Sequence, residues 1–173
     1  MKNKTSLRYL TEAALIAAMY AALTLALPFM TFGPVQCRIA EALTVLPVFT
    51  PAAVPGLLVG CLISNSVGLA MGANVAGALD ILLGTLATAV AALLTRLLRE
   101  KRLRGLPVLA TLPPVLLNAV IVGGELTLVT VGWTPSLLVI NMLLVGAGQL
   151  VACTGGGLLL FKMADKVWKK RIS

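Results

Sequence analysis

Long apolar runs separated by short turns dominate the chain and predict helices that cross a membrane. A bilayer core about 30 Å thick requires roughly 20 apolar residues per helix. Five runs reach about that length, and a shorter one lies between the first two of them. Pro, Gly and Asn mark the turns that separate the runs. The predicted helices cover residues 7–27, 36–49, 52–70, 75–98, 106–129 and 136–167.

The short segment 36–49 is the ambiguous one, since apolar runs of 10–14 residues are more often re-entrant or interfacial. The distribution of basic residues indicates whether this segment crosses the membrane. The N-terminus, the loop at 96–104 and the C-terminal tail are basic, whereas the other connections carry no charge. Basic regions stay on the cytoplasmic side. Four crossings must then precede the basic loop, and only a crossing second segment gives four. The prediction is an all-α bundle of six transmembrane helices with both termini in the cytoplasm.

The amino-acid composition is typical of a membrane protein, and it argues for a single domain that does not bind nucleic acid. Hydrophobic residues make up 59% of the chain and charged residues 12%, whereas soluble domains carry roughly 25% charged residues. The length of 173 residues fits a single membrane-embedded domain, residues 1–173. The net charge of +8 comes from residues that flank apolar runs, so we do not expect nucleic acid as a partner.

No signature of an enzyme stands in the sequence. The chain has no His, no phosphate-binding GxxxxGK[ST] motif and no nucleophile beside a base. Its three cysteines, Cys37, Cys61 and Cys153, have no metal-binding spacing and are expected to be free thiols in the core. We therefore expect a non-enzymatic protein with no metal and no cofactor of its own.

Arg38, Glu41, Asp80 and Glu125 stand alone inside apolar runs, away from the three charged clusters. A charge at the bilayer centre costs about 2.5–3.5 kcal/mol on insertion scales, so such residues usually serve function. With a helical rise of 1.5 Å per residue, the predicted topology puts all four in the outer part of the membrane. Two amides reach the same level and a third lies at the rim. The candidate site residues are Gln36, Arg38, Glu41, Asn65, Asp80, Glu125 and Asn141.

These residues predict one polar pocket that opens outward. Three carboxylates oppose one arginine, which favours a ligand that is cationic or rich in N–H donors. A structural interpretation stays open: Arg38 and Glu41 are i,i+3 neighbours and can neutralise each other, and the other acids can be hydrated near the interface. Asn118 and Gln149, near mid-membrane, are more typical of hydrogen bonds between helices.

Alanines recur every four residues along the first helix, in two adjacent registers. Such small residues let another helix approach closely. Packing within the bundle and docking of a partner both remain possible for this face, whereas Gly56 and Gly60 of the third helix favour internal packing. The docking candidates are Ala13, Ala14, Ala17, Ala18 and Ala21, with Ala22 completing the second register.

The stretch 33–47, with its Gln36-x-Arg38-x-x-Glu41 core, resembles the signature of the QueT family. The likeness continues through 50–57, Asn65, 80–88 and 112–118, and it departs at Cys37 and Ala40. QueT proteins are substrate-binding S components of energy-coupling factor (ECF) transporters. The resemblance implies six helices, an outward-facing site and a queuosine precursor as substrate, a 7-deazaguanine base such as preQ1 or preQ0.

The resemblance also implies partners: a transmembrane coupling subunit, which the alanine face of the first helix would contact, and two cytoplasmic ATPases that consume ATP. The implied location is the plasma membrane of a prokaryote, as a multi-pass protein. A guanine-like edge places a ring N–H beside an exocyclic amine, which suits a bidentate carboxylate. We expect Glu41 and Glu125 to contact the ligand directly, with Asp80 close by.

Three other interpretations stay open from the sequence. The first is an S component for another small cationic, vitamin-like ligand. The second is a structural or assembly membrane protein whose buried charges merely pair. The third is a stand-alone carrier coupled to an ion gradient.

Overall fold

The computed structural model of the protein describes residues 2–33 and 36–172, and its regular elements there are helices. Five helical segments of the described residues are long and apolar enough to cross a membrane. They contain α1 (Lys2–Ala26), α3 (Ala53–Ala70), α4 (Ala78–Leu97), the pair η2 (Val108–Thr111) and α5 (Leu112–Val131), and a final rod of α6 (Pro135–Gln149), η3 (Leu150–Gly156) and α7 (Gly157–Ile172). The predicted all-α architecture is confirmed.

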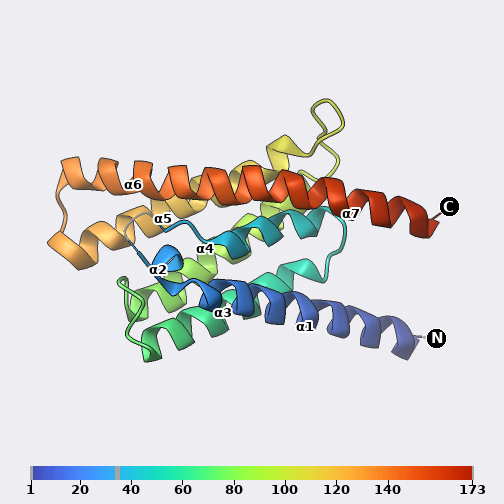
Figure 1. Ribbon diagram of the computed structural model, residues 1–173, viewed down its shortest axis with the longest axis horizontal. Helices are drawn as coiled ribbons and strands as arrows, with labels where there is room; N and C mark the ends of the chain where they lie inside the picture. Colours follow the sequence, from blue (N-terminus) through green and yellow to red (C-terminus); the bar gives the residue numbers. More distant parts are fainter. Residues whose placement is uncertain (1, 34–35, 173) are drawn as a thin grey trace.

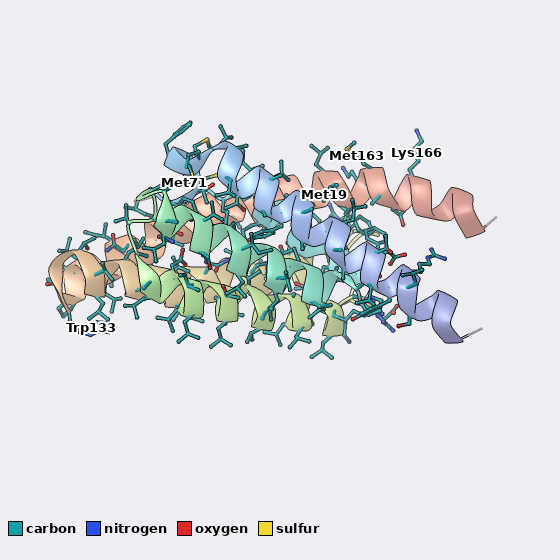
Figure 2. All side chains as sticks on the ribbon, turned by 90° about the horizontal axis from the view of Figure 1, so that it is seen from below. Met19, Met71, Trp133, Met163 and Lys166 are labelled. Atoms are coloured by element: carbon teal, nitrogen blue, oxygen red, sulfur yellow. The ribbon has the colours of Figure 1, made fainter. Side chains whose placement is uncertain are left out.

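The helices run along one common direction (Figure 1), and the two chain ends lie at the same end of the bundle. The basic connection between α4 and η2 lies toward that end too, whereas the uncharged turns after α3 and α5 lie at the opposite end. This arrangement separates a basic end of the bundle from an uncharged end. Large apolar side chains cover the outside, including Met19 and Met163, which point away from the bundle (Figure 2).

The second segment differs from the α-helix expected over 36–49. It is a ten-residue 3₁₀ helix, η1 (Ile39–Val48), preceded by extended backbone at Arg38. Pro47 inside η1 has no N–H to donate. The Thr44 hydroxyl donates to the Glu41 carbonyl oxygen at 2.6 Å. Both features interrupt the α-helical pattern of main-chain hydrogen bonds. At about 2.0 Å per residue a 3₁₀ helix of this length spans about 20 Å. The number of crossings therefore stays a prediction.

Two further local differences follow from proline and glycine. The loop expected over 29–35 begins instead with a short helix, α2 (Pro28–Thr31), because Pro28 is suited to a first helical position. The last rod, expected as one regular helix over 136–167, contains the π-helical segment η3, which includes Gly155 and Gly156. π-helical turns occur often at functional sites, and η3 directly follows the buried Gln149.

Close packing of α1 on α3 separates the two alanine registers. A Cβ at Gly56 would lie 2.7 Å from the Ala13 carbonyl oxygen, and one at Gly60 would lie 2.8 Å from that of Ala17. The two glycines therefore hold the backbone of α1 directly against α3. Ala17 is buried on this side of α1, with Ala13 and Ala21 half-buried. The other register, Ala14, Ala18 and Ala22, is exposed.

Candidate functional site

The four charged residues of the apolar runs lie inside the bundle near its uncharged end. Arg38, Glu41, Asp80 and Glu125 are each at most 3% exposed. Arg38 precedes η1, Glu41 lies in its first turn, Asp80 lies in the first turn of α4, and Glu125 is within the last two turns of α5. Three parts of the chain thus place four charges in the interior of the bundle. With the amides and hydroxyls that contact them, we call them the polar cluster.

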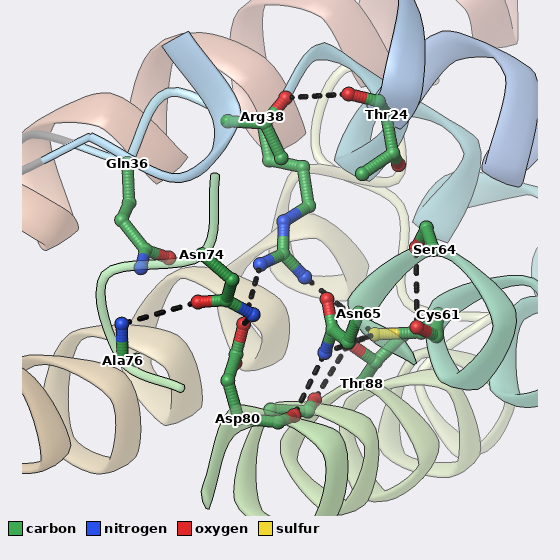
Figure 3. A network of polar contacts seen from close by, with 12 residues as sticks. Thr24, Gln36, Arg38, Cys61, Ser64, Asn65, Asn74, Ala76, Asp80 and Thr88 are labelled. Atoms are coloured by element: carbon green, nitrogen blue, oxygen red, sulfur yellow. Dashed lines mark hydrogen bonds and ion pairs between the residues drawn. The ribbon is translucent and has the colours of Figure 1, made fainter. Parts of the chain in front are cut away.

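Arg38 and Asp80 form the ionic centre of the polar cluster (Figure 3). Arg38 Nη2 lies 3.3 Å from Asp80 Oδ2, and Asn74 Nδ2 donates to the same oxygen at 3.0 Å. Asn65 Nδ2 donates to the Asp80 carbonyl at 2.7 Å. The ion pair of Arg38 is thus with Asp80 of α4 rather than with its sequence neighbour Glu41. Asn74 comes from the turn between α3 and α4, so this turn covers the ion pair.

Glu41 is held by hydroxyl groups. The Tyr20 hydroxyl of α1 donates to Glu41 Oε1. The Thr88 hydroxyl oxygen of α4 lies 3.4 Å from the same Glu41 oxygen and 3.0 Å from the Gly84 carbonyl oxygen, and its one hydrogen serves one of these contacts at a time. The Cys61 sulfur of α3 lies 3.4 Å from the Thr88 hydroxyl oxygen and accepts from Arg38 Nη1 at 3.5 Å. These contacts join α1, η1, α3 and α4 through side chains in the interior. Only one of the two Glu41 oxygens takes part.

Several buried polar atoms of the polar cluster and its surroundings have no hydrogen-bond partner in the part of the chain that the structure describes. Five are strict acceptors: Glu41 Oε2, Asn65 Oδ1, Asp80 Oδ1 and both carboxylate oxygens of Glu125. The others are Gln36 Nε2, Arg38 Nε, Asn118 Nδ2 and the Thr85 hydroxyl. Leaving such a group unpaired costs about 1–3 kcal/mol. Among these unpaired atoms acceptors outnumber donors, so they suit a ligand rich in N–H groups.

Glu125 stands out because neither of its oxygens is bonded, although the residue is only 2% exposed. Its carboxylate is within electrostatic range of Asp80 and Arg38. Of the three buried acids, it alone has both oxygens available for a bidentate contact. No group of three or more His, Cys, Asp or Glu in the described residues is arranged to hold a metal ion.

Gln36 lies near Asn74 and Arg38 (Figure 3). Its backbone conformation is unusual, with a φ of 45°. Its carbonyl oxygen accepts from the Arg38 N–H at 3.1 Å and from Gln149 Nε2 at 3.4 Å. Its side chain is 1% exposed. A non-glycine residue held at positive φ is typical of binding and catalytic sites. Gln149 of α6 thus bonds to the irregular segment that precedes η1 rather than to another helix.

The hydrogen bond of Asn141 of α6 goes to a residue outside the polar cluster. Asn141 is half-buried and donates to the Thr127 hydroxyl of α5 at 2.9 Å, which joins two neighbouring helices. Sequence reasoning did not identify four residues that contact the charged groups: Tyr20, Cys61, Asn74 and Thr88. Tyr20 had a signal, because it is one of only two tyrosines in the chain and lies in the middle of an apolar helix, where its hydroxyl needs a partner.

Three comparisons with known proteins were informative to different degrees. The curated proteins and the solved structures gave no significant match. The sequence model of the QueT transporter family matches residues 10–166, which include every residue of the polar cluster. That family is a transporter family rather than an enzyme family. By this match over most of its length, the chain belongs to the QueT transporter family.

Proposed function

We propose that the protein is the substrate-binding S component of an ATP-driven ECF importer and captures a queuosine precursor, a 7-deazaguanine base, from outside the cell. Family membership supports a transport role. The observation that carries the choice of ligand is the set of buried acceptors without partners around an arginine. These acceptors call for several N–H donors on one small, planar molecule.

A 7-deazaguanine base complements the polar cluster group by group. Its ring N–H and exocyclic amine point the same way, so the two free oxygens of Glu125 can accept both. Its carbonyl oxygen can accept from Arg38 Nε or Gln36 Nε2. An aminomethyl ammonium group, as in preQ1, would lie against Glu41 Oε2 or Asp80 Oδ1. Every proposed contact pairs a ligand group with a protein atom that has no partner in the described chain.

We further propose that the chain crosses the membrane six times, with both termini in the cytoplasm of a prokaryotic cell. The basic end of the bundle carries both termini and the 96–104 loop, and the positive-inside rule assigns that end to the cytoplasm. The polar cluster then lies near the external surface. The described residues between Gln36 and η1 and the connection after η1 would complete the second crossing.

Calorimetry on the purified protein tests the ligand. We expect preQ1 and preQ0 to bind at sub-micromolar affinity, guanine to bind more weakly, and thiamine and riboflavin not to bind. Mass spectrometry of small molecules that leave with the purified protein provides a second readout. A vitamin-like cation that binds in place of every deazaguanine would favour an S component of different specificity. Failure of all small molecules to bind would favour the structural interpretation of the buried charges.

The exposed alanine register of α1 is the surface that we propose for the coupling subunit, because Ala14, Ala18 and Ala22 leave a smooth strip that a partner helix can approach. Ala18→Trp is expected to abolish co-purification with the coupling subunit and the ATPases while leaving ligand affinity unchanged. Pull-down from cells that express all subunits measures this loss.

Leu143→Trp is the matched control, since Leu143 is 68% exposed on α6 and also gains an indole on the lipid-facing surface. Equal loss of partners in both variants would contradict docking through α1. Uptake that persists without any ATPase subunit would instead indicate an autonomous carrier.

A further inference from the structure

A concave apolar surface lies at the basic end of the bundle, away from the polar cluster. A cavity of about 360 Å³ occupies a groove between the end of α4 and the η2–α5 segment. Its lining is apolar, from residues that include Leu94, Leu98, Leu109, Leu112 and Leu116. Leu109 and Leu116 are 46% and 62% exposed, so the groove opens sideways on the outer surface of the bundle rather than into its core.

A tight basic hairpin lies in the chain between two residues that line this groove, Leu98 and Leu109. Leu98 is followed by the connection to η2, in which Leu103 and Leu106 exchange main-chain hydrogen bonds of 2.8 and 3.0 Å. Arg104 and Gly105 between them have φ of 51° and 81°. Positive φ at both central residues is the pattern of a two-residue type I′ hairpin turn. The hairpin therefore presents its cations from a defined backbone.

Most cations of this connection already have partners. Arg96 donates to the Pro47 carbonyl at 2.9 Å, Arg99 pairs with Glu100, and the Arg102 guanidinium lies over the Phe161 ring at 4.7 Å. Lys101 and Arg104 are exposed and make no ion pair with any described residue. Two uncommitted positive charges thus stand in the chain segment that leads out of an apolar groove.

We propose that this groove binds an anionic glycerophospholipid, with one acyl chain along the leucines and the phosphate beside Lys101 and Arg104. The lining offers no polar partner to a soluble ligand, whereas a hydrocarbon chain requires none. Basic pockets beside membrane helices attract anionic headgroups, and each Lys or Arg near the surface contributes about a fivefold gain in affinity. The two cations therefore favour the anionic headgroup, and the apolar lining favours an acyl chain of the same lipid.

The test measures lipid binding to the purified full-length protein in an uncharged detergent by native mass spectrometry. The probes are phosphatidylglycerol and phosphatidylcholine with identical acyl chains. We expect phosphatidylglycerol to bind more tightly. The double variant Lys101→Gln, Arg104→Asn should weaken phosphatidylglycerol binding by roughly 25-fold and leave phosphatidylcholine binding unchanged. Asn is chosen at position 104 because it tolerates positive φ.

Two controls separate this site from general attraction. Arg8→Gln with Lys166→Gln removes an equal amount of positive charge from exposed side chains of α1 and α7. This double variant should leave lipid affinity unchanged. Leu116→Trp fills the groove and should weaken binding of both lipids. Equal affinity for the two lipids, equal loss in both double variants, or equally tight binding of glycerol phosphate without acyl chains would each overturn the proposal. A groove covered by a second copy of the chain in place of lipid would also overturn it.

Discussion

Glu125→Gln is expected to weaken deazaguanine binding by about 100-fold or more while the unliganded protein stays folded. Each hydrogen bond to a charged group contributes about 1.5–3 kcal/mol. The variant loses one of the two acceptors outright, and the bond to the remaining amide oxygen is no longer strengthened by charge. The glutamine amide would also direct N–H groups at the N–H groups of the ligand. Because both Glu125 oxygens are buried without partners, removing the charge relieves a desolvation cost. Thermal stability without ligand should therefore be unchanged or higher.

Calorimetry gives the affinity, and the thermal unfolding midpoint in detergent gives the stability of the same sample. Glu100→Gln is the matched control, because its side chain is 81% exposed and pairs only with Arg99 at the surface. A Glu125→Gln protein that binds as tightly as the parent would remove Glu125 from the contact surface. A large fall in stability without ligand would show instead that Glu125 has a structural role.

Arg38→Met is expected to destabilise the protein by about 3–5 kcal/mol, because it leaves the buried Asp80 carboxylate with a hydrogen bond from Asn74 but no countercharge. Binding should be lost as well. Arg99→Met, which breaks an exposed pair with Glu100, should cost less than about 1 kcal/mol. Chemical denaturation in detergent measures both changes.

The double variant Arg38→Met, Asp80→Asn separates the structural role of the pair from its role in binding. Asparagine at position 80 is neutral and can still accept the bond from Asn74, so most of the lost stability should return. Ligand affinity should not return, since the donor from Arg38 is still missing. Recovery of both stability and binding would mean that the ion pair serves the fold alone.

The convergence of the charged residues follows from topology and could be derived without coordinates. Arg38, Asp80 and Glu125 are far apart in sequence, yet a count of helices and a fixed rise per residue place all three near one end of the bundle. The cost of a charge in an apolar environment then requires them to face inward. The long apolar helices are predictable for a similar reason, because the bilayer sets their length.

The partners of these charges were not predictable, because they depend on rotation and turn geometry rather than on depth. Asn74 lies in a turn without periodicity, and it reaches Asp80 only through the path of the chain after α3. The 3₁₀ form of η1 depends on Pro47 and on the Thr44 hydroxyl. A hydropathy profile does not show how these two groups change the main-chain hydrogen bonds. The π-helical segment after Gln149 likewise has no apolar pattern of its own.

Burial of the polar cluster has a kinetic consequence. Arg38, Glu41, Asp80 and Glu125 are at most 3% exposed, and the turn that carries Asn74 covers the ion pair. For a solute that binds these residues, entry requires part of the surrounding structure to move, so the association rate constant should fall below the diffusional ceiling of about 10⁸–10⁹ M⁻¹s⁻¹. The same barrier slows escape. A scarce nutrient would then be retained through long residence time rather than through rapid encounter.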